Sequence, residues 1–562
     1  MMSGKKGEEK HCSVREKEGR ITRRQAVSTA VKVAAAGVIG LVVGGVAGYF
    51  AKPPEVIEKI KTETVTRTVT QTKTVTSTVT ATTSPTTTTT TPATTTTPAA
   101  PFIPTKYLVS EEEIVKSMRE ANINWRAYEG EEIYVFTLTF PWVDAIKPLI
   151  PIFERETGIK VTWDAVAEME WGDKVNTAFA AGTIPYTGIS LGPIYTWQWA
   201  GPGWLEPLDD YLHNDKLTDP DWFNYDDFIP ATTYVSRWDR ETKKEGTGPT
   251  YFMPGSSLTN LFFYRADMFE KYGFDPKKDF DYWPDVPDKV AELRKALEKD
   301  GLLGQMYPIT LRGIRIFITT EVLTTIMQGW NLTFFDENWK PRFLEPDWIE
   351  AMDVYLRTFK ESGQPVSRIF QTSFYDVAQD IQSGIALSTI DISLDAPLFD
   401  NPATSKVAGK VGCYLVPRGP KGRGSRIWVW GLGMPKNIPQ KKKEATWLFI
   451  EWVTSPVVTK ACALCPAMSF DPCRFSTWED ERFKNLVSTL LRGEWYPYTL
   501  EMYSKYTDGS VYPTIPELLS IMDIMSGPMQ DVIAGKLTTE EAMKQIYDAV
   551  YDLMKTAGYY KE

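Results

Sequence analysis

The stretch PLIPIFERETGIKVTWDAV at residues 148–166, followed by KVNTAFAAGTIPYTGISLG at 174–192, decides the fold. In the first stretch, apolar residues recur at helical spacing as far as Gly158, a natural C-terminal stop, and the chain then alternates like a strand. A second helix follows and ends at Gly182, and the apolar run IYVFTLTF at 133–140 precedes both. The pattern predicts a βαβ unit whose first strand is parallel and covered on both faces.

The rest of the chain continues this alternation of helices and strands. Helices are predicted at 285–299 and 347–361, each closed by a glycine. Strands are predicted at 410–417 and 426–434, joined by a Gly-rich turn. Thr538-Thr-Glu-Glu541 predicts a capping box for the last helix. The predicted class is therefore α/β.

Composition limits the kinds of partner. The 562 residues carry a net charge of −10, and because residues 1–52 hold ten basic and four acidic side chains, the remainder carries −16. An acidic body repels phosphate backbones, so no nucleic-acid partner is expected. The chain has only two histidines, so the commonest metal ligand and general base is nearly absent. No cofactor is expected. Nineteen Trp and 26 Tyr supply many flat amphipathic surfaces.

The N-terminal segment predicts export. Residues 33–51 are almost uncharged and long enough to cross a bilayer, and basic residues precede them. Thr22-Arg23-Arg24-Gln25 resembles a twin-arginine signal, and an ordinary signal-anchor is the alternative. Either interpretation puts the body on the extracellular face of the cell membrane, anchored by this helix, or secreted if the signal is cleaved. The Thr- and Pro-rich residues that follow resemble an extended, O-glycosylated stalk with too little apolar surface to fold.

Several motifs together resemble a known family. They are FERETGIKV (153–161), GWLEPLDDYL (203–212), FFYRADMFEKYGF (262–274), VGCYLVPRGPKG (411–422), WGLGMPKNIPQKKKEATWLFIEWVTSP (430–456) and GKLTTEEAMKQIYDAV (535–550). Their order is similar to that of extracellular solute-binding proteins of ABC importers, in the carbohydrate-binding family 1 that includes maltose-binding protein. The resemblance implies two α/β lobes joined by a hinge that the chain crosses several times. It also implies a carbohydrate, in particular an oligosaccharide, held between the lobes, and a membrane permease and ATPase as partners of a monomeric binding protein. The tethered, Thr-stalked arrangement looks archaeal.

The resemblance and the composition together predict the domain boundaries. We expect a cytoplasmic basic segment at 1–32, a transmembrane segment at 33–51, a stalk at 52–106, lobe I at 131–255 and 428–500, and lobe II at 256–427 and 501–562, the last with the C-terminal helices.

Strand ends indicate where a ligand would bind, because open α/β sheets bind ligands beyond the carboxyl ends of their strands. Sugars present apolar faces ringed by hydroxyls, so their sites combine flat aromatic rings with a few polar groups. The aromatic candidates near strand ends are Trp142, Tyr195, Trp197, Trp428 and Trp430. For any single Trp among so many, packing in the core is the more common role.

Polar candidates complete the predicted site: Asp144, Ser256, Ser257, Asp391 and Arg474. The acidic body disfavours an anionic ligand, and a buried arginine, either Arg312 or Arg474, would reverse this locally.

Catalytic motifs do not form a constellation. Gly188-Ile-Ser190-Leu-Gly192 matches a nucleophile elbow, but the only downstream histidine, His213, is predicted to lie on the surface. Adjacent carboxylates such as Asp209-Asp210 are more typical of a solvated helix start than of a glycosidase pair. The chain is therefore predicted not to be an enzyme. An anchored glycan-degrading enzyme and a binding protein for a non-sugar solute remain the alternatives.

The exported cysteines predict disulfides. Cys413, Cys462, Cys465 and Cys473 form an even set in an oxidising compartment, and sequence does not choose among their three pairings. A four-Cys zinc site is the alternative. Asn331-Leu-Thr333 is a glycosylation sequon, which would make the chain a glycoprotein if its loop is exposed.

Overall fold

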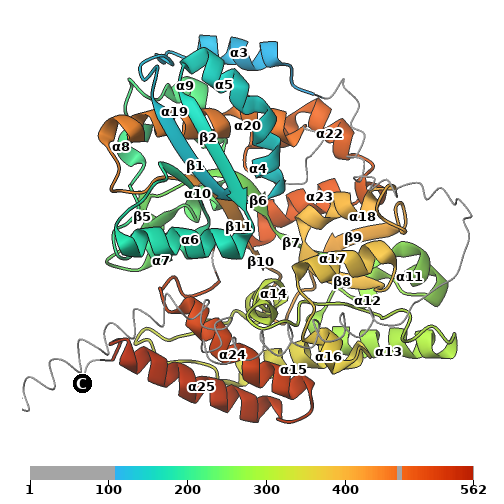
Figure 1. Cartoon of the computed structure of the whole chain (residues 1–562). Helices are drawn as coiled ribbons and strands as arrows, with labels where there is room; N and C mark the ends of the chain where they lie inside the picture. The colour runs from blue at the N-terminus through green and yellow to red at the C-terminus, as the bar shows by residue number, and fades with distance from the viewer. Residues whose placement is uncertain (1–107, 465–470, 510, 561–562) are drawn as a thin grey trace, which may run out of the picture. The chain divides into compact units, whose positions relative to one another are not determined.

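Figure 1 presents the computed structural model, which describes residues 108–464, 471–509 and 511–560. The chain divides into the unit Met1–Thr82, outside these ranges, and the unit Thr83–Glu562, to which everything below belongs. The predicted cytoplasmic segment, membrane segment and stalk all lie outside the described residues. Across the described ranges, no helix combines the length and the apolar character that a membrane crossing requires.

The predicted βαβ unit is present. Its elements are β1 (Glu132–Leu138), α5 (Ile150–Thr157), β2 (Lys160–Val166), α6 (Glu168–Ala181) and β3 (Gly188–Leu191). Gly158 and Gly182 end the two helices in the left-handed conformation, with φ of 71° and 66°, which a residue with a Cβ adopts less readily. β1 pairs in parallel with both β2 and β3, so the carboxyl ends of three strands share one sheet edge.

This unit belongs to lobe I, whose sheet has the strand order β12-β6-β11-β3-β1-β2. The three later strands are β6 (Met253–Leu258), β11 (Trp428–Gly433) and β12 (Asp471–Pro472). Both β6 and β11 come from distant parts of the sequence and run antiparallel to their neighbours. The helices α7 (Pro193–Ala200), α19 (Gln440–Thr454) and α20 (Pro456–Ala463) also belong to this lobe.

Lobe II contains the antiparallel sheet β8-β7-β9. Its strands are β7 (Asn260–Arg265), β8 (Ser388–Ile392) and β9 (Val411–Leu415). The main helices around it are α13 (Val286–Lys299), α14 (Glu321–Trp330), α15 (Pro346–Glu361), α24 (Leu518–Ile533) and α25 (Thr539–Thr556). α15, α24 and α25 pack side by side (Figure 1), and Thr538 and Glu541 form the predicted capping box of α25.

The other elements, in chain order, are α3 (Glu111–Glu120), α4 (Pro141–Ile146), α8 (Asp209–Leu212), α9 (Pro220–Phe223), α10 (Pro230–Tyr234), β4 (Arg237–Asp239), β5 (Lys244–Thr250), α11 (Ala266–Tyr272), α12 (Pro276–Asp279), α16 (Val366–Ile369), α17 (Phe374–Ser383), α18 (Ala396–Asp400), β10 (Ser425–Arg426), α21 (Phe475–Glu479), α22 (Glu481–Val487), α23 (Trp495–Glu501) and β13 (Thr507–Asp508).

The chain passes between the lobes at very short links. β6 of lobe I and β7 of lobe II are separated by Thr259 alone, and β10 and β11 by Ile427 alone. The sequence placed the first boundary at 255/256, whereas β6 continues to Leu258. The segment 490–500, expected in lobe I, packs against β9 and α18 of lobe II.

A small polar cluster surrounds the link at Thr259. Thr259 Oγ1 lies 3.0 Å from Thr507 Oγ1, and the Thr259 carbonyl accepts from the Ser393 N–H at 2.7 Å. The Ser393 hydroxyl donates to Asp471 Oδ2, which also accepts from Tyr503 Oη at 2.8 Å. Asp471 is fully buried, and burial raises its pKa to about 7 despite these two hydrogen bonds. A carboxyl group that ionises with difficulty therefore sits beside the hinge.

The predicted disulfide framework is not formed among the described residues. Cys413 and Cys473 are buried free thiols, Cys413 in β9 of lobe II and Cys473 directly after β12 of lobe I. Cys462 is buried in α20, and Cys465 lies outside the described residues. The prediction relied on the oxidising compartment and on the even number of cysteines. Neither requires the Cβ atoms of two cysteines to lie close enough for a disulfide.

The raised pKa of Asp471 predicts a pH dependence of stability. A carboxyl whose pKa is higher in the folded state than in the unfolded state stabilises the fold fully below about pH 4, and this contribution is lost as pH rises through about 7. In the wild type, this carboxyl should lower the free energy of unfolding by up to about 1.4 kcal/mol for each pH unit over that window. Asp471→Asn has no group to ionise there, so the variant should lack this decrease. Urea denaturation at several pH values measures this difference. Asp548→Asn, at an exposed carboxylate, should leave the slope unchanged. Parallel slopes for wild type and Asp471→Asn would contradict the assignment.

Candidate functional site

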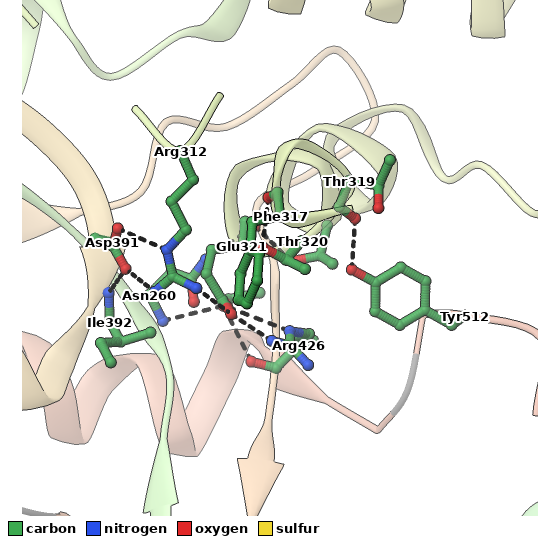
Figure 2. A network of polar contacts seen from close by, with 12 residues as sticks. Asn260, Arg312, Phe317, Thr319, Thr320, Glu321, Asp391, Ile392, Arg426 and Tyr512 are labelled. Atoms are coloured by element: carbon green, nitrogen blue, oxygen red, sulfur yellow. Dashed lines mark hydrogen bonds and ion pairs between the residues drawn. The ribbon is translucent and has the colours of Figure 1, made fainter. Parts of the chain in front are cut away.

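Lobe II contains a chain of buried, alternating charges (Figure 2). Arg312 donates from Nε to Asp391 Oδ2 at 3.0 Å and from Nη1 to Glu321 Oε1 at 3.2 Å, and its Nη2 also bonds Asp391. Arg426 donates from Nε to Glu321 Oε2 at 3.2 Å and from Nη2 to Glu321 Oε1. Glu321 thus joins two guanidinium groups. We call Arg312, Glu321, Asp391 and Arg426 the charge network.

Four separate segments supply the charge network. Asp391 lies in β8, Glu321 is the first residue of α14, Arg426 is in β10, and Arg312 lies in the loop that precedes α14. Burial alone would raise the pKa of Glu321, but the charges of Arg426 and Arg312 outweigh it and lower the pKa. Asn260 reinforces the arrangement, since its side-chain amide donates to the Glu321 carbonyl at 2.9 Å.

Aromatic rings flank both arginines. The Arg312 guanidinium lies 5.0 Å from the centre of the Phe374 ring, and that of Arg426 lies 4.7 Å from Trp428. Phe317, four residues before Glu321 in the chain, is 38% exposed, which is high for such a large apolar side chain. The charge network therefore lies beside apolar surface that solvent still reaches.

Lobe I contributes an aromatic wall, which we define as Trp171, Tyr195, Trp428 and Trp430. Tyr195 and Trp430 stack at 5.8 Å, Trp171 meets the edge of Tyr195 at 4.8 Å, and Trp428 meets Trp430 at 5.4 Å. Trp171 comes from the helix after β2, and Tyr195 from the helix after β3. Tyr195 and Trp428 are half-buried, whereas Trp171 and Trp430 are buried and support them from the interior. Gly192 permits this packing, because a Cβ there would lie 3.1 Å from the Trp428 ring and 3.2 Å from that of Trp430.

Glu168 connects the wall to the charge network. Its Oε1 accepts from Tyr195 Oη at 3.0 Å. The side chain remains in contact with solvent, yet the surrounding protein raises its pKa by desolvation, against the hydrogen bond from Tyr195 and the charges of Arg312 and Arg426. The charges of two lobe II arginines therefore act on the pKa of a lobe I carboxylate. Aromatic faces, one acid and two cations meet where the lobes face each other.

Four of the predicted site residues lie in this region: Tyr195, Trp428 and Trp430 in the wall, and Asp391 in the charge network. Ser256 is close to them, since it pairs with Trp430 in the β6–β11 ladder. Its buried hydroxyl has no hydrogen-bond partner among the described residues.

The other predicted site residues serve the interior or the surface of lobe I. Trp142 and Trp197 are 1% exposed, and the Trp142 ring packs against the backbone of Gly255. Ser257 donates to the Asp471 carbonyl at 3.3 Å, and Asp144 pairs with Lys147.

Arg474 is a core residue. Its side chain is fully buried, pairs with Asp227 at 3.3 Å and lies 3.8 Å from the centre of the Phe228 ring. Desolvation lowers its pKa to about 10. Of the two arginines considered from sequence, only Arg312 belongs to the charge network.

Sequence reasoning missed Glu168, Trp171, Glu321 and Arg426. The strand-end rule could have found Glu168, which follows β2 by two residues, and Trp171 one turn later. No local pattern marks Glu321 or Arg426, because their pairing joins residues 105 positions apart.

Catalytic and metal alternatives find no support in the described residues. Ser190 is buried inside β3 rather than exposed on a turn, and His213 is exposed, with Nδ1 2.8 Å from the Asp209 carbonyl oxygen. The part of the chain that the structure describes holds no group of three or more Asp, Glu, His or Cys that could ligate a metal ion.

Two surface pockets lie on lobe I away from the charge network. One, of about 340 Å³, is lined by residues of α3 and α20 together with Trp222. The other, of about 420 Å³, includes Asp209, His213 and Tyr225. Neither combines aromatic faces with groups from both lobes, so the facing surfaces of the two lobes remain the better candidate.

Comparison with known proteins identifies the family. Residues 141–460 match the family model described as bacterial extracellular solute-binding protein. The chain is 26% identical over 371 residues to the erythritol/L-threitol-binding protein of Mycolicibacterium smegmatis, covering 65% of this chain and 75% of that one. It is 24% identical over 451 residues to the mannitol-binding protein of Pseudomonas aeruginosa, covering 77% and 96%. A solute-binding protein of Agrobacterium vitis with bound D-mannitol has a TM-score of 0.62 and 25% identity, covering 77% of this chain and all of that one.

Removing the carboxylate shared by the two arginines should destabilise the fold. Glu321→Ala leaves two buried guanidinium groups short of a partner, which costs about 3–5 kcal/mol in the free energy of unfolding. Asp548→Ala, which removes an exposed pair with Lys544, should cost less than about 1 kcal/mol. Urea denaturation compares the two variants. A loss for Glu321→Ala no larger than that of the surface control would show that the charge network is not structurally required.

Proposed function

Because this chain belongs to the bacterial extracellular solute-binding protein family, we propose that it is the solute-capturing component of an ABC importer and binds a polyol or sugar between its two lobes. The observation that carries the proposal is the convergence of the aromatic wall and Glu168 of lobe I with Arg312 and Arg426 of lobe II. A membrane permease and its ATPase are the proposed partners that receive the solute.

The chemistry of these groups suits a polyhydroxyl solute. Carbon–hydrogen faces of a polyol or sugar pack on aromatic rings, while carboxylates and guanidinium groups accept from and donate to hydroxyls. The two arginines are already neutralised by Glu321 and Asp391, so they can donate hydrogen bonds without requiring an anionic ligand. The names of the relatives agree, since they specify erythritol or L-threitol and mannitol. A small polyol is therefore preferred here over the oligosaccharide expected from sequence.

The proposed mechanism is closure of the two lobes around the solute. The links at Thr259 and Ile427 are one residue long, and Thr259 contacts Thr507 of β13, so small changes in the backbone angles of these links would rotate one lobe against the other. A solute bound to the aromatic wall would then recruit the arginines of lobe II. No catalytic step is proposed.

The export and tethering of the body are also proposals. They are supported by the uncharged residues 33–51, the basic residues before them and the Thr-rich residues after them. This arrangement would hold a monomeric body near the permease. Asn331 is exposed at the end of α14, which is compatible with glycosylation of its sequon.

A screen by isothermal titration calorimetry tests the proposed ligand class. We expect mannitol or erythritol to bind the purified protein without being consumed. Binding of amino acids in place of polyols and sugars would support the non-sugar alternative, and turnover of an oligosaccharide would support a glycan-degrading enzyme.

Substitution in the aromatic wall should weaken that binding. Trp428→Ala removes a half-buried ring and should lower affinity about tenfold, equivalent to about 1.4 kcal/mol. Trp222→Ala is the matched control, because Trp222 is also half-buried but packs on Trp125 near α3. Equal affinities for wild type and Trp428→Ala would remove this residue from the proposed site.

A further inference from the structure

Glu168 carries a charge that no ion pair of the described residues neutralises. Its side chain is exposed to solvent, and its one hydrogen bond within those residues comes from Tyr195 Oη to Oε1, at 3.0 Å. Glu170, two residues later on the same helix, is paired with Lys174 at 2.6 Å. The second carboxylate oxygen of Glu168, Oε2, is therefore left without a partner from the part of the chain that the structure describes.

Solvent and the helix both favour the ionised form of Glu168. It is the first residue of the 14-residue helix α6, whose N-terminus carries a partial positive charge. Desolvation by the surrounding protein raises the pKa of Glu168, but the hydrogen bond from Tyr195 and the charges of Arg312 and Arg426 oppose that shift. Because the side chain is exposed, water also donates to it. Glu168 is therefore a carboxylate that a solute in the candidate site can reach.

The charge network of lobe II does not supply the missing positive charge. Its two arginines are paired with two carboxylates, so the network as a whole is neutral. A further carboxyl group, that of Asp395, also acts electrostatically on Arg312. With Glu168 added, the candidate site carries a net negative charge, although it contains two guanidinium groups.

We propose that Glu168 makes this site select neutral polyols and sugars over their anionic derivatives, such as polyol phosphates and sugar acids. A hydroxyl group of a neutral solute can donate a hydrogen bond to Glu168 Oε2. An ionised phosphate or carboxylate group instead brings acceptor oxygens and like charge to the same carboxylate, and this opposes binding. The inference rests on the function proposed above and adds which solutes of that class are rejected.

Calorimetry with three solutes of one carbon skeleton tests the selection. Mannitol, mannitol 1-phosphate and mannonate are titrated into the full chain; if erythritol is the polyol that binds, its phosphate and erythronate replace them. We expect the wild type to bind the neutral polyol at least about 100-fold more tightly than either anion. Glu168→Gln should reduce this preference at least about tenfold, and should weaken mannitol by less than about tenfold because Gln keeps an acceptor oxygen.

Two variants separate the local charge of Glu168 from other effects. Glu170→Gln removes the same charge from the same exposed turn of α6, at a residue that is paired with Lys174, and should leave the preference unchanged. Glu168→Asp keeps the negative charge on a shorter side chain, so it should still reject both anions. The rejection should also weaken in the wild type as the salt concentration is raised, because salt screens charges that solvent reaches.

The outcomes distinguish this inference from the proposed function. Equal affinity of the wild type for mannitol and mannitol 1-phosphate, or tighter binding of the anion, would overturn the inference and leave a polyol-binding protein. An unchanged preference in Glu168→Gln would overturn it as well. An equal loss of preference in Glu170→Gln would assign the effect to the overall charge of the body and count against Glu168. If the wild type binds no polyol or sugar of either kind, the proposed function fails and the inference falls with it.

Discussion

Burial of unlike charges in lobe II is the constraint on which the rest of the candidate site depends. Glu321 can remain ionised in the interior only because Arg312 and Arg426 both bond it, and neither arginine would be stable there alone. The pairing holds Arg426 in place, and Arg426 is two residues from Trp428 of the aromatic wall. The same contacts that satisfy buried charge in lobe II therefore also position a ring of lobe I.

Local patterns were sufficient to predict the framework of the fold. The helical spacing that stops at Gly158 and Gly182, the alternation of β2 and the capping box at Thr538 all depend on residues a few positions apart. The strand-end rule also led to Tyr195, which follows β3, because the carboxyl edge of the parallel strands is fixed once the strands are known. These are consequences of chain geometry that a single sequence expresses directly.

Features that depend on contacts between residues far apart in the chain could not be predicted from the sequence. Arg474 and Trp142 are the same residue types as members of the candidate site, and only their packing against Phe228 and Gly255 assigns them to the core. Free Cys413 and Cys473 show that an even number of thiols does not determine pairing. Glu321 and Arg426 were missed for the same reason. Each is held by an oppositely charged partner about a hundred residues away, and the sequence does not show that pairing.

The run Arg426-Ile427-Trp428 has a consequence for how this site can evolve. One residue separates a guanidinium of lobe II from an indole of lobe I, and both sit in strands with fixed pairing to β13 and to β6. An insertion or deletion here would shift both strands out of register and turn their side chains to the opposite face. Under the function proposed above, changes of solute preference at this place are therefore expected to arise by substitution rather than by a change of chain length.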